Sequence, residues 1–531
     1  MDSVIGIDIG TQSTKALLVD AEGRILAQHS QRYRVDTPQP LWAEQWPNVW
    51  LAAVFDCIRG CLAQSPGFAE SVRGLCVSSL YGGSGIPVDD RIEPLHPCLI
   101  WMDRRAQQEV DWIKSTLDLD RLHAITGNGV DSYYGYTKML WLKAHRPEVW
   151  AKTRYLLPPN SYVNYHLCGE IAIDHSSAGN IGGIYDLEAR QWSPIMAGAL
   201  GLDLDKLPQR LVDSADSVGG LLPEVAASLG LPPGIPVVAG GVDAAMATLA
   251  AGATRPGKHV AMIGTSMCWG YIGQQVDARH GLISMPHVLA SQRDLYTFGG
   301  ALTAGASVSW FLDTFCQAEQ AVAETAGQEV HERLEAQART LEPGARGLLF
   351  LPYLMGERSP IWDAKASGAF VGLSLYHQRH HLYRAVLEGV SYALRHNMQA
   401  GVQASDGNGP ALDPQLIVVG GAAQSDLWMQ IVADVTGYSV VTFEEDVEAA
   451  LGAALLAGLC SGIMPAEWLD EGHGRQIVRA TPDPGARQRY DRLYRLYCEL
   501  YPALKPVLHE LSATRDVGEE NADKGEASHG P

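Results

Sequence analysis

Short apolar runs separated by polar turns make up the first 30 residues, and this pattern predicts a β-hairpin followed by another strand. These strands are expected at Ser3–Ile9, 16–20 and 24–29. Further runs of strand length lie at 74–79, 232–241 and Gln415–Val419. Helical spacing or alanine-rich composition predicts helices at 46–62, 104–117, 137–144, 244–251 and 449–459. Strands alternate with helices in both halves, which indicates α/β domains.

The length of the chain and one short segment define the expected domains. A chain of 531 residues is too long for a single core. The sequence Ala-Thr-Arg-Pro-Gly-Lys at 253–258 marks a junction, so we expect an N-terminal domain at 1–253 and a C-terminal domain at 254–511. Tyrosines and leucines spaced three and four apart over 490–501 predict a terminal amphipathic helix. Residues 512–531 carry five acidic and two basic residues and no apolar cluster, so this tail is expected to be disordered.

Charge and composition narrow the classes of partner. The chain has 60 acidic and 40 basic residues, a formal net charge of −20 that repels nucleic acid at long range. No apolar run approaches the roughly 18 residues of a membrane span, and the N-terminus lacks the features of a signal peptide, so we expect a cytoplasmic protein without a membrane partner. The nine cysteines form no CxxC pair, and Cys57 and Cys61 lack the second pair that a zinc site needs.

Two turns of similar sequence follow strands that lie far apart in the chain. Gly10-Thr11-Gln12-Ser13 follows the first strand, and Gly264-Thr265-Ser266 follows the apolar run at 260–263. Glycine allows close approach of a ligand, and the hydroxyls and amides of such turns can hold phosphate oxygens. The repeat predicts a duplicated phosphate clamp. Asp8, next to the first turn, could orient a magnesium ion or its water ligands.

Asp243 is the strongest candidate for chemistry. It lies where the strand at 232–241 passes through two glycines into a helix, close to the sheet edge at which α/β folds bind ligands. An aspartate there can cap the helix, act as a catalytic base, or do both. Phosphoryl transfer requires clamped phosphates, a metal ion and an aligned nucleophile, and Asp8, the two turns and Asp243 would supply them.

The motifs, taken in order, resemble those of the FGGY carbohydrate kinases, members of the actin and hexokinase-like ATPase class. The resemblance covers roughly residues 3–505 and rests on segments 8–15, 240–245, 264–268, 351–360, 368–388 and 420–430. It implies an α/β fold of two actin/hexokinase-like, ribonuclease H-like ATPase domains hinged around a central cleft. It also implies ATP and Mg²⁺ as cofactors.

The resemblance assigns roles to individual positions. Asp243 matches the general base, and Asp8 with Asp243 matches the magnesium site, where the ion is held through water. The nucleotide is expected to contact Asp8, Thr11, Gln12, Ser13, Lys15, Gly264, Thr265, Gly305, Ser309, Gly421, Ala422 and Asp426. Tyr81, Trp101, Asp103 and Asp243 are expected on the sugar side.

Departures from the family pattern concern the sugar. The loop at 78–85 lacks the Met-His pair of xylulose and gluconate kinases, while 242–244 and 264–268 look more like ribulose kinases. We therefore expect ATP-dependent phosphorylation of a small open-chain sugar, first a pentulose such as xylulose or ribulose. Gluconate or a polyol (glycerol, erythritol or ribitol) is the alternative. Two other classes are a non-catalytic module that senses sugar or ATP and a chaperone-like ATPase. By analogy, the protein could be a homodimer.

Overall fold

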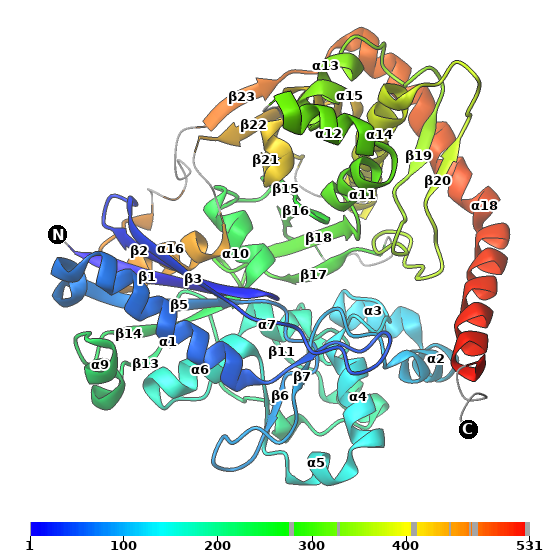
Figure 1. Ribbon diagram of the computed structural model, residues 1–531. Coiled ribbons are helices and arrows are strands. Elements are labelled where there is room, and N and C mark those ends of the chain that lie inside the picture. Colours follow the sequence, from blue (N-terminus) through cyan, green and yellow to red (C-terminus); the bar gives the residue numbers. More distant parts are fainter. Residues whose placement is uncertain are drawn as a thin grey trace, which may run out of the picture.

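The computed structural model describes residues 2–275, 281–326, 330–404, 411–444, 448–466, 469 and 476–525. Two β-sheets form the centres of two lobes, drawn below and above each other in Figure 1. The lower, first lobe comes mainly from the first half of the chain. The upper, second lobe comes from the second half.

The first sheet has six strands, and its central part mixes parallel and antiparallel pairing. Its order is β13 (Ser217–Gly220), β14 (Pro236–Val242), β5 (Val72–Ser79), β1 (Ser3–Ile9), β2 (Ser13–Asp20) and β3 (Ile25–Arg32). β14, β5 and β1 are parallel, whereas β1, β2 and β3 are antiparallel neighbours. β1 has the predicted bounds, and β2 begins three residues before the predicted start at 16 because the turn at Gly10 is tight.

The second sheet repeats this arrangement. Its order is β17 (Ile283–Pro286), β18 (Leu295–Ala301), β16 (Met267–Gly273), β15 (His259–Ile263), β21 (Gln415–Val419), β22 (Ser439–Phe443) and β23 (Gln476–Ala480). Read outwards from the hairpin, β18-β16-β15-β21-β22 corresponds to β3-β2-β1-β5-β14, with the same parallel and antiparallel pairs. The predicted fold class of two related α/β domains is confirmed.

Helices of the first half cover one face of the first sheet and build the rest of the first lobe. α1 begins at a proline, which suits the first helical position, and it buries apolar residues three and four apart. The helices are α1 (Pro47–Gln64), α2 (Gln107–Thr116), α3 (Leu119–Thr126), α4 (Gly135–His145), α5 (Pro147–Lys152), α6 (Pro159–Cys168), α7 (His175–Asn180), α8 (Pro194–Leu200), α9 (Pro223–Leu229) and α10 (Asp243–Ala250). The nine cysteines are free, and Cys57 and Cys61 are buried on α1.

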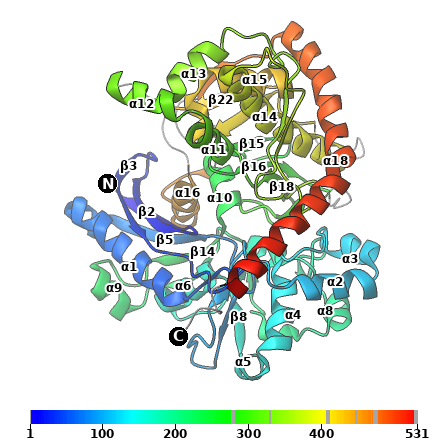
Figure 2. The ribbon, with the colours of Figure 1, turned by 45° about the vertical axis from the view of Figure 1, so that its right-hand side comes forward.

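The other face of the first sheet is covered by a helix from the second half. α16 (Ala449–Ser461) packs against β1 and β5 and crosses α10 between the lobes (Figure 2). A side chain on Gly6 of β1 would lie 2.1 Å from the carbonyl oxygen of Ala450, so glycine is required there. The expected boundary at 253/254 separates the two sheets, but α16 lies on the sheet of the first half. The alanine- and leucine-rich residues of α16 are buried on all sides, because the helix lies between the first sheet and α10.

The helices of the second lobe include the longest in the molecule's described part. They are α11 (Gly305–Phe315), α12 (Gln317–Ala326), α13 (Val330–Ala338), α14 (Arg379–Ala404), α15 (Asp426–Thr436) and α18 (Pro484–Gly525), with the small hairpin β19 (Leu349–Leu351) and β20 (Ala369–Val371). Within the described residues, none of the helices has the length and apolar character needed to cross a membrane.

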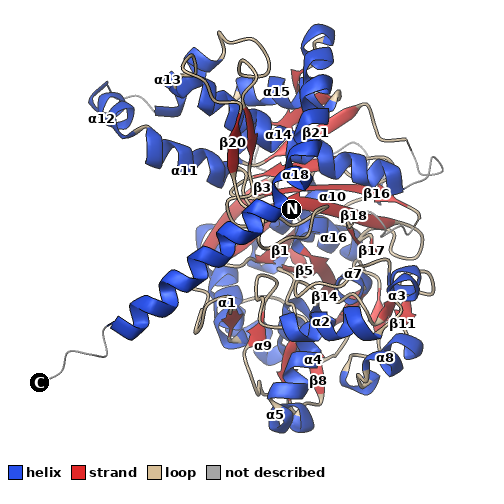
Figure 3. Cartoon of the chain, turned by 90° about the vertical axis from the view of Figure 1, so that its right-hand side faces the viewer, coloured by secondary structure: helices blue, strands red, loops and turns tan. Residues whose placement is uncertain are grey.

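α18 differs from the expectation for the end of the chain. The amphipathic pattern predicted a helix near 490–501, but α18 runs from Pro484 to Gly525 and projects from the body of the molecule (Figure 3). It therefore enters the tail expected to be disordered, whose alanine, glutamate and lysine residues favour helix. Residues 526–531 lie outside the described residues.

Candidate active site

The first glycine-threonine turn is held from behind by side chains of the first lobe. The amide of Gly10 donates to the carbonyl oxygen of Ser13 at 2.9 Å, which closes the turn between β1 and β2. The hydroxyl of Tyr33 donates to the Gly10 carbonyl at 2.6 Å, and Gln45 donates to the Thr11 carbonyl at 3.0 Å. The turn is therefore fixed while Gln12 stays exposed, as a phosphate-binding turn requires.

The second turn has a corresponding closing bond. The amide of Gly264 donates to the Ser266 carbonyl at 2.9 Å, and the amide of Gly305 donates to the Gly264 carbonyl at 2.8 Å. A side chain at Gly305 would lie 2.6 Å from that carbonyl, so only glycine lets α11 begin this close to the turn. Helix N-termini carry partial positive charge, and α11 therefore brings a favourable field for an anion to Thr265.

Asp8 and Asp243 are partly buried acids that lie close enough for their charges to interact. Asp8 lies on β1 and accepts a hydrogen bond from the Ser78 hydroxyl of β5 at 2.9 Å. Asp243 is the first residue of α10, and one of its oxygens accepts the Ala244 amide at 2.7 Å. Burial raises the pKa of both carboxyl groups, and the charge of Asp243 raises that of Asp8 further. Two acids of this kind are suited to holding a proton or a cation.

Positive charge reaches the carboxylate pair from two directions. The Lys15 ammonium forms an ion pair with Glu448, which directly precedes α16. From the second lobe, the Arg358 guanidinium lies near enough to Asp243 to lower its pKa, against the effect of burial. Glu448 and Arg358 were not predicted as site residues. Arg358 lies inside the motif at 351–360 that supported the family resemblance, and its place in that motif could have indicated it as a site residue.

A wall of aromatic side chains lies beside Asp243. Tyr81 follows β5, and its ring centroid lies 5.0 Å from that of Tyr133. Trp362, from the second lobe, packs on Tyr133 and Tyr134 with centroid distances of 6.3 and 6.2 Å. The Tyr81 hydroxyl accepts a hydrogen bond from the amide of Gly135, the first residue of α4, and this bond joins α4 to the segment that follows β5. Tyr133 and Tyr134 were not predicted, since only the fold brings them to the site.

Trp101 joins the predicted sugar side to the predicted phosphate side. Its indole nitrogen donates to the hydroxyl of Thr11 at 3.1 Å, and its ring is partly exposed. The structure thus brings Trp101 and Thr11 together, as their expected roles in one site require.

Asp103, predicted on the sugar side, has its carboxylate occupied by hydrogen bonds within the first lobe. Its carboxylate is buried and accepts a hydrogen bond from the Ala43 amide at 2.7 Å. The Nε atom of Arg105 donates to both carboxylate oxygens, at 3.0 and 2.9 Å. Arg105 also pairs with Glu44 and lies 3.6 Å from the centroid of Trp42. Because its lone pairs are occupied, Asp103 stabilises the first lobe. The opposite charges of Asp103 and Arg105, two residues apart, could have indicated this ion pair from the sequence.

Asp103→Asn tests whether Asp103 stabilises the first lobe or binds sugar. We expect the unfolding free energy to fall by about 1–3 kcal/mol, because a buried guanidinium loses part of its anionic partner. The KM for sugar should stay within about 2-fold, since the side chain does not reach the site. Thermal unfolding and steady-state kinetics measure the two quantities. A KM raised about 10-fold with unchanged unfolding would restore Asp103 as a sugar ligand.

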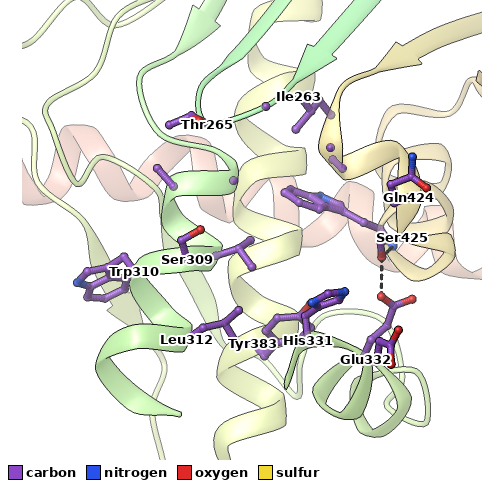
Figure 4. A pocket seen from close by; sticks show the side chains of 18 of the residues that line it. Ile263, Thr265, Ser309, Trp310, Leu312, His331, Glu332, Tyr383, Gln424 and Ser425 are labelled. Carbon is purple, nitrogen blue, oxygen red and sulfur yellow. Dashed lines mark hydrogen bonds between the residues drawn. The ribbon is translucent and has the colours of Figure 1, made fainter. Parts of the chain in front are cut away.

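Seven predicted nucleotide residues line one cavity in the second lobe. The cavity, of about 1320 Å³, is bounded by the second turn and by α11, α13 and the start of α15 (Figure 4). The seven residues are Gly264, Thr265, Gly305, Ser309, Gly421, Ala422 and Asp426. Asp8, Thr11, Gln12, Ser13 and Lys15 lie on the first lobe, at the β1–β2 hairpin. The expected nucleotide positions therefore fall into two groups, one on each lobe.

Other residues of this cavity were not predicted. Glu335 of α13 accepts the Ser425 hydroxyl at 2.8 Å, shown as a dashed line in Figure 4, and the Leu427 amide at 3.2 Å. It thereby ties α13 to the beginning of α15. Tyr383 and Trp428 add aromatic surface to the wall. The carboxylate of Asp426 pairs with Arg479 of β23. No local pattern marks α13 as a cavity wall, because its contacts come from elements that lie far along the chain.

Models of known protein families match the chain on both sides of the expected junction. The N-terminal domain model of the FGGY family of carbohydrate kinases matches residues 3–250, and the C-terminal domain model of the same family matches residues 259–460.

Relatives with two different activities align with almost the whole chain. The xylulose kinase of Lactococcus lactis subsp. lactis (strain IL1403) is 30% identical over 523 residues, covering 98% of this chain and 100% of the relative. The gluconokinase of Bacillus licheniformis is 30% identical, covering 94% of this chain and 96% of the relative. The crystal structure of xylulose kinase from Rhodospirillum rubrum superposes with a TM-score of 0.84 and 31% identity, covering 96% of this chain and 100% of that one.

Proposed function

The chain belongs to the FGGY family of carbohydrate kinases, and we propose that it transfers the γ-phosphoryl group of ATP to a hydroxyl group of a pentulose. One observation carries the proposal: the charges of the Asp8 and Asp243 carboxylates interact, and Asp8 lies beside the first phosphate turn. A carboxylate at this place can accept a proton from a hydroxyl group while the turns hold the phosphates. The cavity of the second lobe then receives the adenosine part of ATP.

In the proposed reaction, Asp243 is the base. The sugar hydroxyl loses its proton to the Asp243 carboxylate as its oxygen forms a bond to the γ-phosphorus. The bond from that phosphorus to the bridging oxygen of the β-phosphate breaks, and ADP leaves with the electron pair. Burial favours the neutral acid, so the Asp243 carboxylate gains from accepting this proton. Thr11 and Thr265, on their two turns, would hold phosphate oxygens from opposite lobes.

Asp8 and Asp243 also suit a magnesium ion, held through water as the sequence predicts. Carboxylate oxygens are its preferred protein ligands, and an ion here would offset the repulsion that raises the pKa of Asp8. When bound, the ion neutralises charge that develops on the phosphates. Lys15, now paired with Glu448, lies on the same hairpin and would turn toward the phosphates.

The assignment of the sugar rests on the relatives and on the aromatic wall. Tyr81, Tyr133 and Trp362 present apolar ring faces, against which the carbon chain of a neutral sugar can pack. Gluconate is the second candidate, favoured by one feature. The Nε atom of Arg358 is buried and, among the described residues, has no hydrogen-bond partner, so a substrate carboxylate could pair with it. Homodimer formation and a cytoplasmic location stay predictions from the sequence.

The test is ADP release by the purified protein with Mg-ATP across pentuloses, pentitols, tetritols, glycerol and gluconate. Strong turnover with xylulose or ribulose supports the proposal and names the sugar. Turnover with gluconate or a polyol alone would replace the pentulose assignment. Silence across the panel, with ATP binding confirmed, would favour the sensing module.

The acid limb of the pH profile tests the role of Asp243. Only the ionised carboxylate accepts a proton, so kcat/KM for sugar should fall as pH drops through the pKa of Asp243. Burial raises that pKa, so the limb should lie above the ordinary aspartate value of about 4. Arg358→Gln removes a charge that lowers the pKa and should move the limb to higher pH. A profile flat down to about pH 5 in both proteins would contradict Asp243 as the base.

A further inference from the structure

α18 presents a regular stripe of polar side chains to the second lobe. Tyr497, Tyr501, Lys505 and His509 follow one another four residues apart, so they lie on one face of the helix. The hydroxyl of Tyr497 lies 2.9 Å from that of Tyr353, which follows β19.

Three members of the stripe converge on one carboxylate, that of Asp363. Its Oδ2 accepts from the Tyr501 hydroxyl and from Nε2 of His509 at 2.7 Å, and the Lys505 ammonium lies 3.5 Å away. Burial raises the pKa of Asp363, but hydrogen bonds from Tyr501, His509 and the Lys365 amide outweigh it and lower the pKa to about 2. Asp363 is therefore ionised at neutral pH and tightly held.

Asp363 closes the base of a short loop at 357–363, called here the Arg358 loop. Its amide donates to the Glu357 carbonyl at 3.0 Å, and the Glu357 amide donates to the Asp363 carbonyl at 2.9 Å. Within the loop, the Trp362 amide donates to the Arg358 carbonyl at 2.6 Å. The placement of Asp363 therefore sets the placement of Arg358 and Trp362.

Two side chains of the Arg358 loop, those of Arg358 and Trp362, lie at the candidate active site. Arg358 lies near Asp243 and also near Tyr133, since its charge lowers the pKa of each. Trp362 packs against Tyr133 and Tyr134 of the first lobe. An error of about 1 Å in such a group can cost up to about 100-fold in rate.

We propose that α18 is a positioning strut for catalysis, and that Asp363, Tyr501 and His509 are positioning residues acting through Arg358. This inference rests on the proposed function, because the readout is sugar phosphorylation. None of the described side chains of α18 lines the second-lobe cavity. The helix fixes the loop from which the second lobe reaches the base on the first lobe.

The experiment is a double-mutant cycle between Asp363 and Arg358 in the full-length protein. Asp363→Asn should lower kcat about 10-fold and leave the Kd of ATP within about 2-fold, because the second-lobe cavity is untouched. In an Arg358→Lys background, Asp363→Asn should lower kcat by less than about 2-fold, because the guanidinium that Asp363 positions has already been replaced. Tyr501→Phe should show the same pattern, whereas His509→Gln, which keeps a donor, should retain most of the activity.

Two comparisons separate this inference from other outcomes. Glu510→Gln changes an exposed neighbour on the same helix and should leave kcat unchanged. Equal losses from Asp363→Asn in both backgrounds would show a general structural role and overturn the strut, as would unchanged kcat. Sugar-dependent turnover of the unmodified protein in the same assay shows independently that the proposed function holds.

Discussion

Asp243→Ala is expected to lower kcat by at least about 100-fold, because the variant has no carboxylate to accept the hydroxyl proton. The Kd of ATP should stay within about 2-fold, since the second-lobe cavity contains no atom of Asp243. Single-turnover kinetics with the best sugar of the panel and equilibrium nucleotide binding measure the two quantities.

Asp243→Asn is the matched control for shape. It keeps the size of the side chain and can still accept the Ala244 amide, but it cannot take up the proton. A loss as large as that of the alanine variant would show that proton acceptance, and not space filling, is the function of Asp243. Near-normal turnover in both variants, with sugar-dependent ADP release intact, would exclude Asp243 as the base.

Glu388→Ala should produce the largest loss of stability, about 3–5 kcal/mol, because it leaves a buried guanidinium without its anion. Glu388 lies on α14, and its Oε1 accepts from Arg384 at 2.7 Å, from the Tyr490 hydroxyl at 2.7 Å and from the Gly344 amide at 2.9 Å. The side chains of Arg384 and Glu388 are 6% and 1% exposed, so water cannot replace the lost bonds. Chemical denaturation monitored by fluorescence measures the change.

The control is an ion pair of the same chemistry on the surface. Glu342 pairs with Arg489, and these side chains are 79% and 49% exposed. Glu342→Ala should leave the unfolding midpoint unchanged, because solvent already screens this pair. Equal shifts for the two variants would contradict the importance of the buried network. Arg384 also donates to the carbonyl oxygens of Ala338 and Leu341, so the network holds the end of α13 near the cavity.

The sequence predicted those parts of the site that depend on local pattern. A β-branched run ending at Gly-Thr is a local signal, and the structure has a turn at each of the two predicted positions and Asp243 at the start of α10. The motif at 368–388 carried the family resemblance, but its charged residues Arg384 and Glu388 connect α14 to α13 and α18. That function could not be inferred from the motif itself, because its partners lie outside it.

The sequence did not indicate the contacts that residues make across the fold. Tyr133 and Trp362 belong to opposite lobes, and no spacing along the chain indicates that their rings meet. Asp103 was assigned to the sugar by resemblance, whereas its hydrogen bonds are taken by Arg105. The tyrosine and leucine spacing over 490–501 indicated the helix, but the hydrogen bond from His509 of α18 to Asp363 became visible only in the fold.

The packing of α16 on the first sheet has a consequence for biosynthesis. The sheet of the first lobe is complete once β14 ends at Val242, but α16, which packs against β1, β5 and β14 of this sheet, ends only at Ser461. During synthesis on the ribosome, the apolar face that α16 will cover stays exposed until about 200 further residues have been made. Nascent chains with exposed apolar surface are prone to aggregate. We therefore expect the first half of the chain to fold stably only once the second half has been made.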